Sequence, residues 1–202
     1  MPPMPDGPDP KIFRRTMGLF ATGVSVMAVH GEGGVVGMTA NSVTSVSLDP
    51  MLVLVCVDHR ARIAPYVTIG RRFAINFLRD DQEVLSRYFA SGWRDRPPPE
   101  FRFETWGGAP RLVGALAAVR CQVDRLFDGG DHHIALGRVL DLHEGPSPWH
   151  PLLFFAGRYR RLAPPETPAA PPEERGPDGV SIYYEEWSGA DRPQVEATDP
   201  PL

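Results

Sequence analysis

The chain has 202 residues, of which 42% are hydrophobic, and its formal net charge is −4 at pH 7. This length predicts one domain, or one domain with a tail, that buries a core without disulfide bonds. There is no basic stripe and no apolar run long enough to span a bilayer, so nucleic acid and a membrane are excluded as partners and we expect a cytoplasmic protein.

The first predicted element is a helix that starts at Asp9 and Pro10. Asp is a favoured N-cap and Pro is favoured at the first helical position. An apolar stripe runs along this helix, and Gly23 is the predicted end. The stripe comprises Ile12, Phe13, Thr16, Met17, Leu19 and Phe20. Strands are then expected at residues 24–29, at residues 37–48 after a tight glycine connection, and at residues 52–57, the last buried on both faces.

The second half of the chain predicts more strands than helices. A short helix over residues 61–69 closes at Gly70, and a second helix opens at the acidic residues 80–83. Its predicted buried face comprises Val84, Leu85, Tyr88 and Phe89. Strands are predicted at residues 73–78, 112–123 (with a bulge at Gly114), 134–142 and 152–155, and residues 158–162 end the body of the protein. This succession favours a mainly β fold with a few helices, an antiparallel sheet closed into a barrel.

Charge and proline divide the chain into three parts. Residues 163–202 hold nine acidic residues and two arginines, whereas the preceding body is mildly basic. We expect a flexible N-terminus over residues 1–10, one domain over residues 11–162 and a Pro-rich acidic tail over residues 163–202.

Side-chain hydroxyls gather in residues 39–47. If this stretch is one strand, Thr39, Asn41, Val43, Ser45 and Ser47 point to the same side. Hydroxyls and an amide beside a tight turn suit a polar, flat or phosphorylated ligand. The alternative is a polar strand edge that is only solvated.

Glycines at residues 31–37 do not form a dinucleotide-binding loop. The last position of a G-x-G-x-x-G motif would fall on Val36, and no amphipathic helix follows. A β-hairpin turn explains these glycines better.

Two adjacent histidines, His132 and His133, stand at the start of a predicted strand and point to opposite faces. No further metal ligands lie at suitable spacing, so no metal site is predicted. One histidine either faces a pocket, where it donates to a ligand or moves a proton, or it has no task beyond the turn. Cys56 and Cys121 lie in apolar runs and are predicted to be buried hydrophobes.

Several motifs, in this order, resemble the flavin reductase-like family of FMN-binding split barrels. The similar segments are FATGV at residues 20–24, GMTANS at 37–42, SVSLDP at 45–50, FAINFL at 73–78, GDH at 130–132 and PLLFF at 151–155. The resemblance covers roughly residues 11–162. It implies a homodimer with FMN or FAD at the subunit interface, and an NADH- or NADPH-dependent flavin reductase that passes reduced flavin to a partner monooxygenase.

The resemblance also implies site residues. The histidine matching His132 sits near the nicotinamide, and we take it as the catalytic residue; its charge state would tune that role. The segment matching residues 39–42 lines the flavin, and a common aromatic matches Tyr159. The full set of predicted cofactor-binding residues is Thr39, Ala40, Asn41, Ser42, Ser45, Ser47, Val57, Asp58, Ala61, Asn76, Phe77, Gln82, Arg87, His132 and Tyr159.

Two other functions are open at this point. In one, the chain holds flavin without turnover because the tail, with Tyr183, Tyr184 and Trp187, covers the nicotinamide site. In the other, a tightly held flavin acts directly on an organic substrate. The tail could also be disordered or bind the partner oxygenase.

Overall fold

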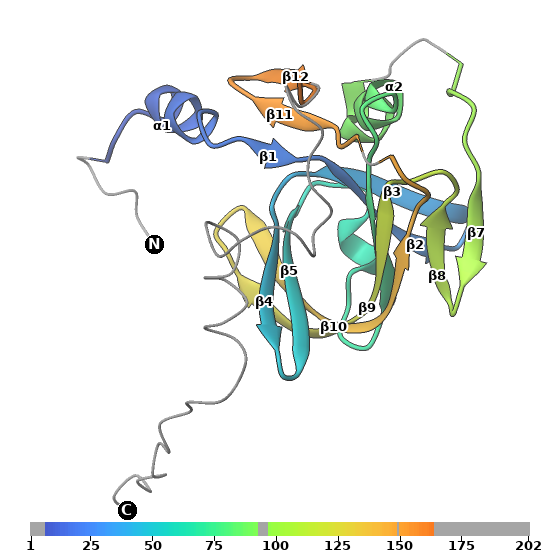
Figure 1. The fold of residues 1–202 in the computed structure, drawn as a ribbon. Coiled ribbons are helices and arrows are strands. Elements are labelled where there is room, and N and C mark those ends of the chain that lie inside the picture. The colour runs from blue at the N-terminus through green and yellow to red at the C-terminus, as the bar shows by residue number, and fades with distance from the viewer. Residues whose placement is uncertain (1–6, 93–96, 149, 164–202) are drawn as a thin grey trace, which may run out of the picture. The chain divides into compact units, whose positions relative to one another are not determined.

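A seven-stranded antiparallel sheet dominates the computed structural model, which describes residues 7–92, 97–148 and 150–163 (Figure 1). Consecutive strands are joined mostly by short turns, which favour antiparallel neighbours. In spatial order the strands are β3 (Gly34–Ala40), β2 (Ser25–Gly31), β6 (Arg72–Phe77), β9 (Ala117–Asp128), β10 (His132–Glu144), β5 (Met51–Asp58) and β4 (Val43–Leu48). The prediction of a mainly β fold is confirmed.

Smaller elements lie around this sheet. A three-stranded sheet comprises β1 (Thr22–Gly23), β11 (Leu153–Phe155) and β12 (Arg158–Arg160), and a hairpin comprises β7 (Phe103–Trp106) and β8 (Ala109–Leu112). The helical elements are α1 (Pro10–Met17), the 3-10 turn η1 (Ala64–Tyr66), α2 (Glu83–Arg87) and the π-helical turn η2 (Tyr88–Gly92). None of the helices in the described residues is long and apolar enough to cross a membrane.

The main core is enclosed by the curvature of the large sheet. Met27 of β2 and Val55 of β5 stand near opposite ends of the strand order, yet both belong to one buried cluster with Phe73 and Ile75 of β6. Side chains from both ends of a sheet share one core only if the sheet curls strongly. A second cluster includes Leu85 and Phe89 of the α2–η2 segment and lies against Val26.

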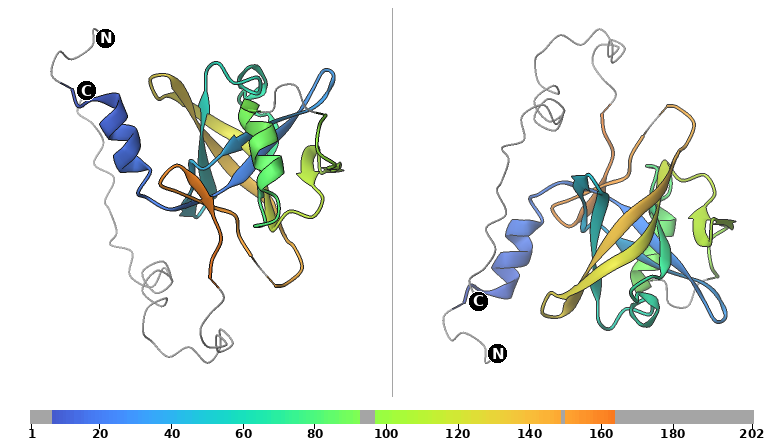
Figure 2. Two further views of the ribbon diagram at one scale, coloured as in Figure 1. Left: turned by 90° about the horizontal axis from the view of Figure 1, so that it is seen from above. Right: turned by 90° about the horizontal axis from the view of Figure 1, so that it is seen from below.

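Helix α1 stands apart from the large sheet, as both views in Figure 2 show. The Asp9 carboxylate accepts a hydrogen bond from the Lys11 N–H at 2.8 Å, which confirms the predicted cap. The helix ends at Gly18, so the predicted end at Gly23 is wrong. No residue of α1 is buried, so its apolar stripe does not pack into the core of this chain.

The hydroxyl-rich stretch is two strands rather than one. β3 ends at Ala40 and β4 begins at Val43, so Asn41 and Ser42 lie in a break, and β4 contains a register shift between Ser45 and Ser47. The break destroys the simple alternation that we expected. The glycine turn is, as predicted, the β2–β3 hairpin, with Gly34 at φ +123°.

Four other local predictions need correction. Residues 61–69 hold only the 3-10 turn η1, and residues 112–123 comprise the end of β8, a turn with Gly114 at φ +80°, and the start of β9. Val84 is exposed, whereas Leu85 and Phe89 are buried as predicted. β5 is buried only in part, because Val53, Leu54 and Cys56 are half-buried. The predicted strands at residues 24–29, 73–78 and 134–142 agree with β2, β6 and β10.

Candidate functional site

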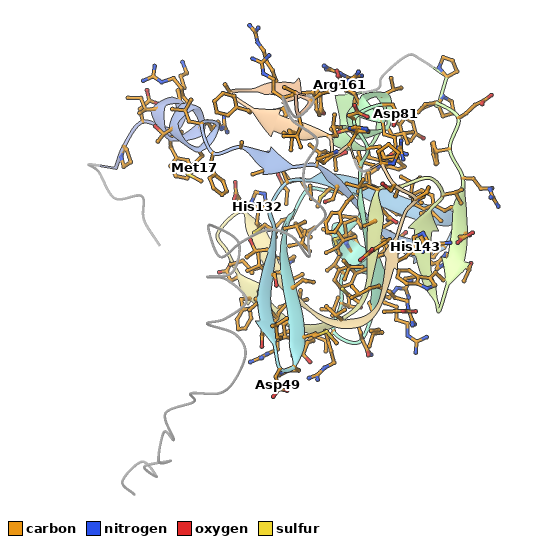
Figure 3. All side chains as sticks on the ribbon, viewed as in Figure 1. Met17, Asp49, Asp81, His132, His143 and Arg161 are labelled. Carbon is orange, nitrogen blue, oxygen red and sulfur yellow. The ribbon has the colours of Figure 1, made fainter. Side chains whose placement is uncertain are left out.

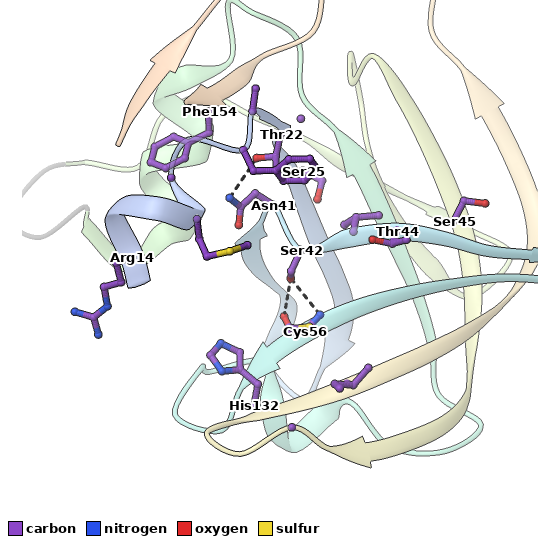
Figure 4. A pocket seen from close by; sticks show the side chains of 18 of the residues that line it. Arg14, Thr22, Ser25, Asn41, Ser42, Thr44, Ser45, Cys56, His132 and Phe154 are labelled. Atoms are coloured by element: carbon purple, nitrogen blue, oxygen red, sulfur yellow. Dashed lines mark hydrogen bonds between the residues drawn. The ribbon is translucent and has the colours of Figure 1, made fainter. Parts of the chain in front are cut away.

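A cavity of about 1070 Å³ lies where α1, the β3–β4 junction and the start of β10 approach one another (Figure 4). This volume accommodates a ligand of the size of a flavin or a dinucleotide. Its lining residues include Phe13, Met17, Phe20, Thr22, Asn41, Ser42, Thr44, Ser45, Cys56, Phe77, Asp131, His132 and Phe154.

The polar side of the cavity is built by the β3–β4 junction. The Ser42 hydroxyl accepts from the Cys56 N–H at 3.1 Å and donates to the Cys56 carbonyl at 3.3 Å. It thereby replaces backbone hydrogen bonds that are lost where the strand breaks. Asn41 Nδ2 donates to Thr22 Oγ1 at 3.3 Å, which leaves the Asn41 carbonyl oxygen and a second N–H for a ligand.

Aromatic and apolar side chains form the opposite wall. Phe13 and Met17 come from α1, Phe20 follows it, and Phe154 comes from β11. Phe13 is 58% exposed and Phe20 is 70% exposed, so their apolar area is available to a ligand or a protein partner. An apolar wall that faces a hydrogen-bonding edge is the arrangement that a flat heteroaromatic ring requires.

His132 closes the cavity from β10. Its Nδ1 lies 2.6 Å from Asp131 Oδ1, and both residues line the cavity. The hydrogen bond from His132 holds the pKa of the Asp131 carboxyl below its usual range. Figure 3 shows His132 on the same side of the molecule as Met17, and Figure 4 shows its ring directed toward the side where Ser42 lies.

A second carboxylate stands opposite His132 on the neighbouring strand. Asp58 is the register partner of His132 in the β5–β10 ladder, and Arg60 holds it through three hydrogen bonds of 2.8 to 3.1 Å. These bonds hold the pKa of the Asp58 carboxyl well below its usual range. The residue after it, His59, packs against His133, with ring centroids 4.2 Å apart. The two adjacent histidines therefore have different surroundings.

Comparison with known proteins decides the family. The model of the flavin reductase like domain matches residues 17–163. The chain belongs to the flavin reductase-like family.

Individual relatives in this family are similar over most of their length. The NADH-dependent FAD reductase of Streptomyces globisporus is 43% identical over 159 residues, which cover 75% of this chain and 85% of that protein. The reductase subunit HsaB of a flavin-dependent monooxygenase from Rhodococcus jostii is 35% identical over 167 residues, covering 81% and 83%.

Solved structures give the same result. The flavin reductase PheA2 in its native state aligns with a TM-score of 0.72 and 41% identity, covering 78% of this chain and all of that one. The Streptomyces globisporus NADH:FAD oxidoreductase SgcE6, in complex with NAD and FAD fragments, aligns with a TM-score of 0.70 and 40% identity, covering 80% and 99%. The family resemblance found in the sequence is confirmed.

The cavity of this flavin reductase-like chain contains five of the predicted cofactor-binding residues. They come from three separate parts of the chain. These residues are Asn41, Ser42, Ser45, Phe77 and His132. His132 therefore lines the cavity, and its role toward a cofactor stays a prediction.

A second group of predicted residues meets on the α2 side, outside the cavity. Thr39 Oγ1 donates to the Ser86 carbonyl at 2.6 Å, and the Ser86 hydroxyl lies 2.9 Å from the Tyr159 hydroxyl. The Arg87 guanidinium stands 4.8 Å from the centre of the Tyr159 ring and pairs with Glu83. These side chains support one another within the protein, and their role toward a cofactor stays a prediction.

The remaining predicted residues have internal partners or lie in the core. Asn76 is fully buried, donates to the Val26 carbonyl at 3.1 Å and accepts from the Leu112 N–H at 2.8 Å. Gln82 bonds the backbone of Arg79 and Gly114. Ala40 and Val57 are buried, Asp58 and Ala61 form a turn, and Ser47 accepts from the Asp49 N–H at the β4–β5 turn. Their assignment to a cofactor also stays a prediction.

The sequence reasoning missed most of the apolar wall. Phe13, Met17, Phe20 and Phe154 were not among the predicted site residues, although all four line the cavity. The apolar stripe of α1 was visible in the sequence, but we did not assign it to the site. Asp131 was noted only as part of the GDH motif.

Proposed function

We propose that this chain is an NADH-dependent flavin reductase that supplies reduced flavin to a partner flavin-dependent monooxygenase. The observation that carries the proposal is the cavity: an apolar wall faces the amide of Asn41, and His132 stands beside it, in a chain of this family. Relatives named as NADH-dependent flavin reductases and as reductase subunits of monooxygenases support the same function.

The cavity residues fit a flavin in size and chemistry. Phe13, Phe20 and Phe154 offer apolar surface to the isoalloxazine ring. At the polar edge of the ring, the carbonyl oxygen of Asn41 offers an acceptor and its second N–H offers a donor. A bound flavin supplies the hydride-accepting chemistry, and the protein supplies the position and hydrogen bonds. Its own contribution is to hold the donor ring near the flavin and to exclude water. His132 is the residue that we assign to the nicotinamide side.

The relatives favour NADH as the electron donor. Four that match at 38% to 43% identity are named as NADH-dependent, one with FAD, one with FMN and two with the flavin unspecified. We therefore propose NADH over NADPH, with either FMN or FAD as the acceptor. We propose a cytoplasmic location for two reasons. The proposed reaction consumes NADH, and both cysteines of the chain are free thiols, as is usual in a reducing compartment.

We also propose that the chain forms a homodimer of split barrels. The strong curl of the large sheet supports the barrel. The dimer is supported by α1, whose eight residues bury none of their side chains, because so short a helix is marginal without tertiary packing. Ile12, Phe13, Met17, Leu19 and Phe20, from the helix and the segment after it, are 49% to 70% exposed. A second subunit would cover this surface.

Anaerobic absorption spectroscopy tests the function. Purified full-length protein is mixed with FMN or FAD, then with NADH or NADPH, while the oxidised flavin band at about 450 nm is followed. We expect rapid bleaching with many flavins reduced per protein and a preference for NADH. No bleaching with either donor would contradict the proposal. A single bound flavin that only an organic substrate reduces would favour the direct-oxidoreductase alternative.

The tail requires its own comparison. Residues 164–202 lie outside the described residues. The three roles considered for the tail, namely disorder, cover over the nicotinamide site and binding of the oxygenase, therefore stay predictions. We propose residues 11–162 as the reductase domain, so a protein ending at Ala163 should reduce flavin. Turnover that appears only after this truncation would show that the tail covers the nicotinamide site. Equal turnover, with loss of coupling to an oxygenase, would favour partner binding.

A further inference from the structure

Asp131 holds the His132 ring through the shortest side-chain contact in the cavity lining. The two residues are adjacent in sequence, and their Oδ1 and Nδ1 atoms are 2.6 Å apart. A carboxylate only accepts hydrogen bonds, so Nδ1 of His132 must carry the proton in this contact. The other ring nitrogen, Nε2, is then the atom left for a ligand.

The surrounding charges make Asp131 different from the other nearby carboxylate. Asp58 stands across the ladder from His132, but Arg60 already binds both of its carboxylate oxygens. Within the part of the chain that the structure describes, His132 is the one side chain that forms a hydrogen bond with the Asp131 carboxylate. The negative charge of Asp131 therefore acts mainly on the His132 ring.

We propose that Asp131 is the positioning residue for His132: it fixes the tautomer with the proton on Nδ1, which would leave Nε2 available to a nicotinamide in the cavity. This inference rests on the proposed function. A hydrogen bond to the second nitrogen of a working histidine commonly sets its tautomer and orientation. In this chain the orienting group comes from the turn directly before β10, next to the histidine that it holds.

Replacement of the carboxylate by an amide gives a directed test. Asp131→Asn keeps the shape of the side chain, but its NH₂ group can donate to Nδ1, which favours the opposite tautomer with the proton on Nε2. Long-range ¹⁵N–¹H NMR spectra of the full-length protein report the tautomer, and the His132→Gln spectrum assigns the signal. We expect the Nδ1–H pattern in the wild type and a change toward Nε2–H in Asp131→Asn.

Kinetics provide the second readout. We expect Asp131→Asn to raise KM for NADH about tenfold, at the low end of what outer partners of a histidine contribute, with little change in flavin affinity. In a His132→Ala background the same substitution should change KM for NADH hardly at all, because the ring through which Asp131 acts is absent. Asp141→Asn is the matched control: it removes one charge from β10, from a carboxylate paired with Arg120.

Two results would overturn the inference. One is an unchanged His132 spectrum in Asp131→Asn, and the other is an equal loss from Asp131→Asn with and without His132. The NMR result does not depend on turnover. If the wild type oxidises no NADH while the tautomer responds to Asp131→Asn, the proposed function fails and the positioning contact stands.

Discussion

The hydroxyl of Ser42 bonds both backbone groups of Cys56, at 3.1 Å to the N–H and 3.3 Å to the carbonyl. One side chain thus ties the gap between β3 and β4 to the neighbouring strand, and the gap is where the cavity opens. The stability of the sheet edge and the shape of the site depend on the same hydroxyl.

Removal of this hydroxyl should therefore affect both properties. We expect Ser42→Ala to lower the free energy of unfolding by about 1–2 kcal/mol, because two half-buried backbone groups lose their partner, and to weaken flavin binding. Chemical denaturation and flavin titration measure the two effects. Thr44→Ala, which removes an exposed hydroxyl nearby, should change stability by no more than about 0.5 kcal/mol. Equal stability losses in both variants would contradict the role given to Ser42.

Asn41 should matter for flavin binding far more than for stability. Its contact with Thr22 is long, 3.3 Å, and exposed, so Asn41→Ala removes little internal structure. We expect about a tenfold loss of flavin affinity, the effect of one ligand hydrogen bond of about 1.4 kcal/mol. Fluorescence titration of the flavin measures it. Thr22→Ala, which removes only the internal partner, should lose less; the reverse order would place the ligand contact on Thr22.

The apolar surface around α1 predicts the effect of a charge on assembly. Leu19 is 62% exposed in the single chain, and we expect it to be covered by a second subunit. Leu19→Asp should shift the sedimentation coefficient from dimer to monomer and weaken flavin binding. Ile69 is 71% exposed and lies far along the chain, so Ile69→Asp is the control. An unchanged dimer in Leu19→Asp would exclude this surface as the interface.

The Asp58–Arg60 pair predicts a pH-dependent contribution to stability. The pKa of Asp58 is depressed in the folded state, so the unfolded chain binds its proton first as the pH falls. The stabilisation is complete above about pH 5 and declines as the pH falls from about 4 toward 2. Arg60→Ala should lower Tm at pH 7 by about 1–2 °C, since the pair is exposed, and by less at low pH.

Thermal melts at several pH values check this sign. Arg158 forms no ion pair within the described residues, so Arg158→Ala is the control and its Tm difference should not vary with pH. A Tm difference for Arg60→Ala that grows on acidification would contradict the assignment.

The two cysteines should differ in reactivity. Burial raises the pKa of the Cys121 thiol to about 12, so it should not react with iodoacetamide in the folded protein at about pH 8. Cys56 is half-buried and lines the cavity, so it should be labelled slowly, and bound flavin should slow it further. Peptide mass spectrometry identifies the site. Labelling of Cys121 at a similar rate, or no protection by flavin, would contradict these positions.

The sequence predicted most elements that end at strong local signals. The Asp9 cap, the glycine hairpin before β3 and the apolar strand β6 follow from side-chain chemistry within a few residues. The break at Asn41 and Ser42 was missed because these residues are ordinary strand residues, and the partner that replaces the ladder, Cys56, lies 14 residues away. Such a tertiary contact leaves no local pattern.

The site was predicted in part for the same reason. His132 and Asn41 belong to motifs with unusual polar residues, which mark them in the sequence. Phe13 and Phe154 are apolar, and nothing in their spacing distinguishes a ligand wall from a core. The stripe of α1 would face the core only if the segment after Gly18 placed the helix against the sheet, and the local sequence does not determine that placement.

The break between β3 and β4 also links ligand occupancy to the motion of the sheet. Both strands are edges of the seven-stranded sheet, and two residues join them. A molecule bound at Asn41 and Ser42 would therefore contact the junction between the two edge strands of one sheet and restrict their relative motion. Amide hydrogen exchange should slow on flavin binding in β3 and β4 first, while the central strands β6 and β9 keep their rates.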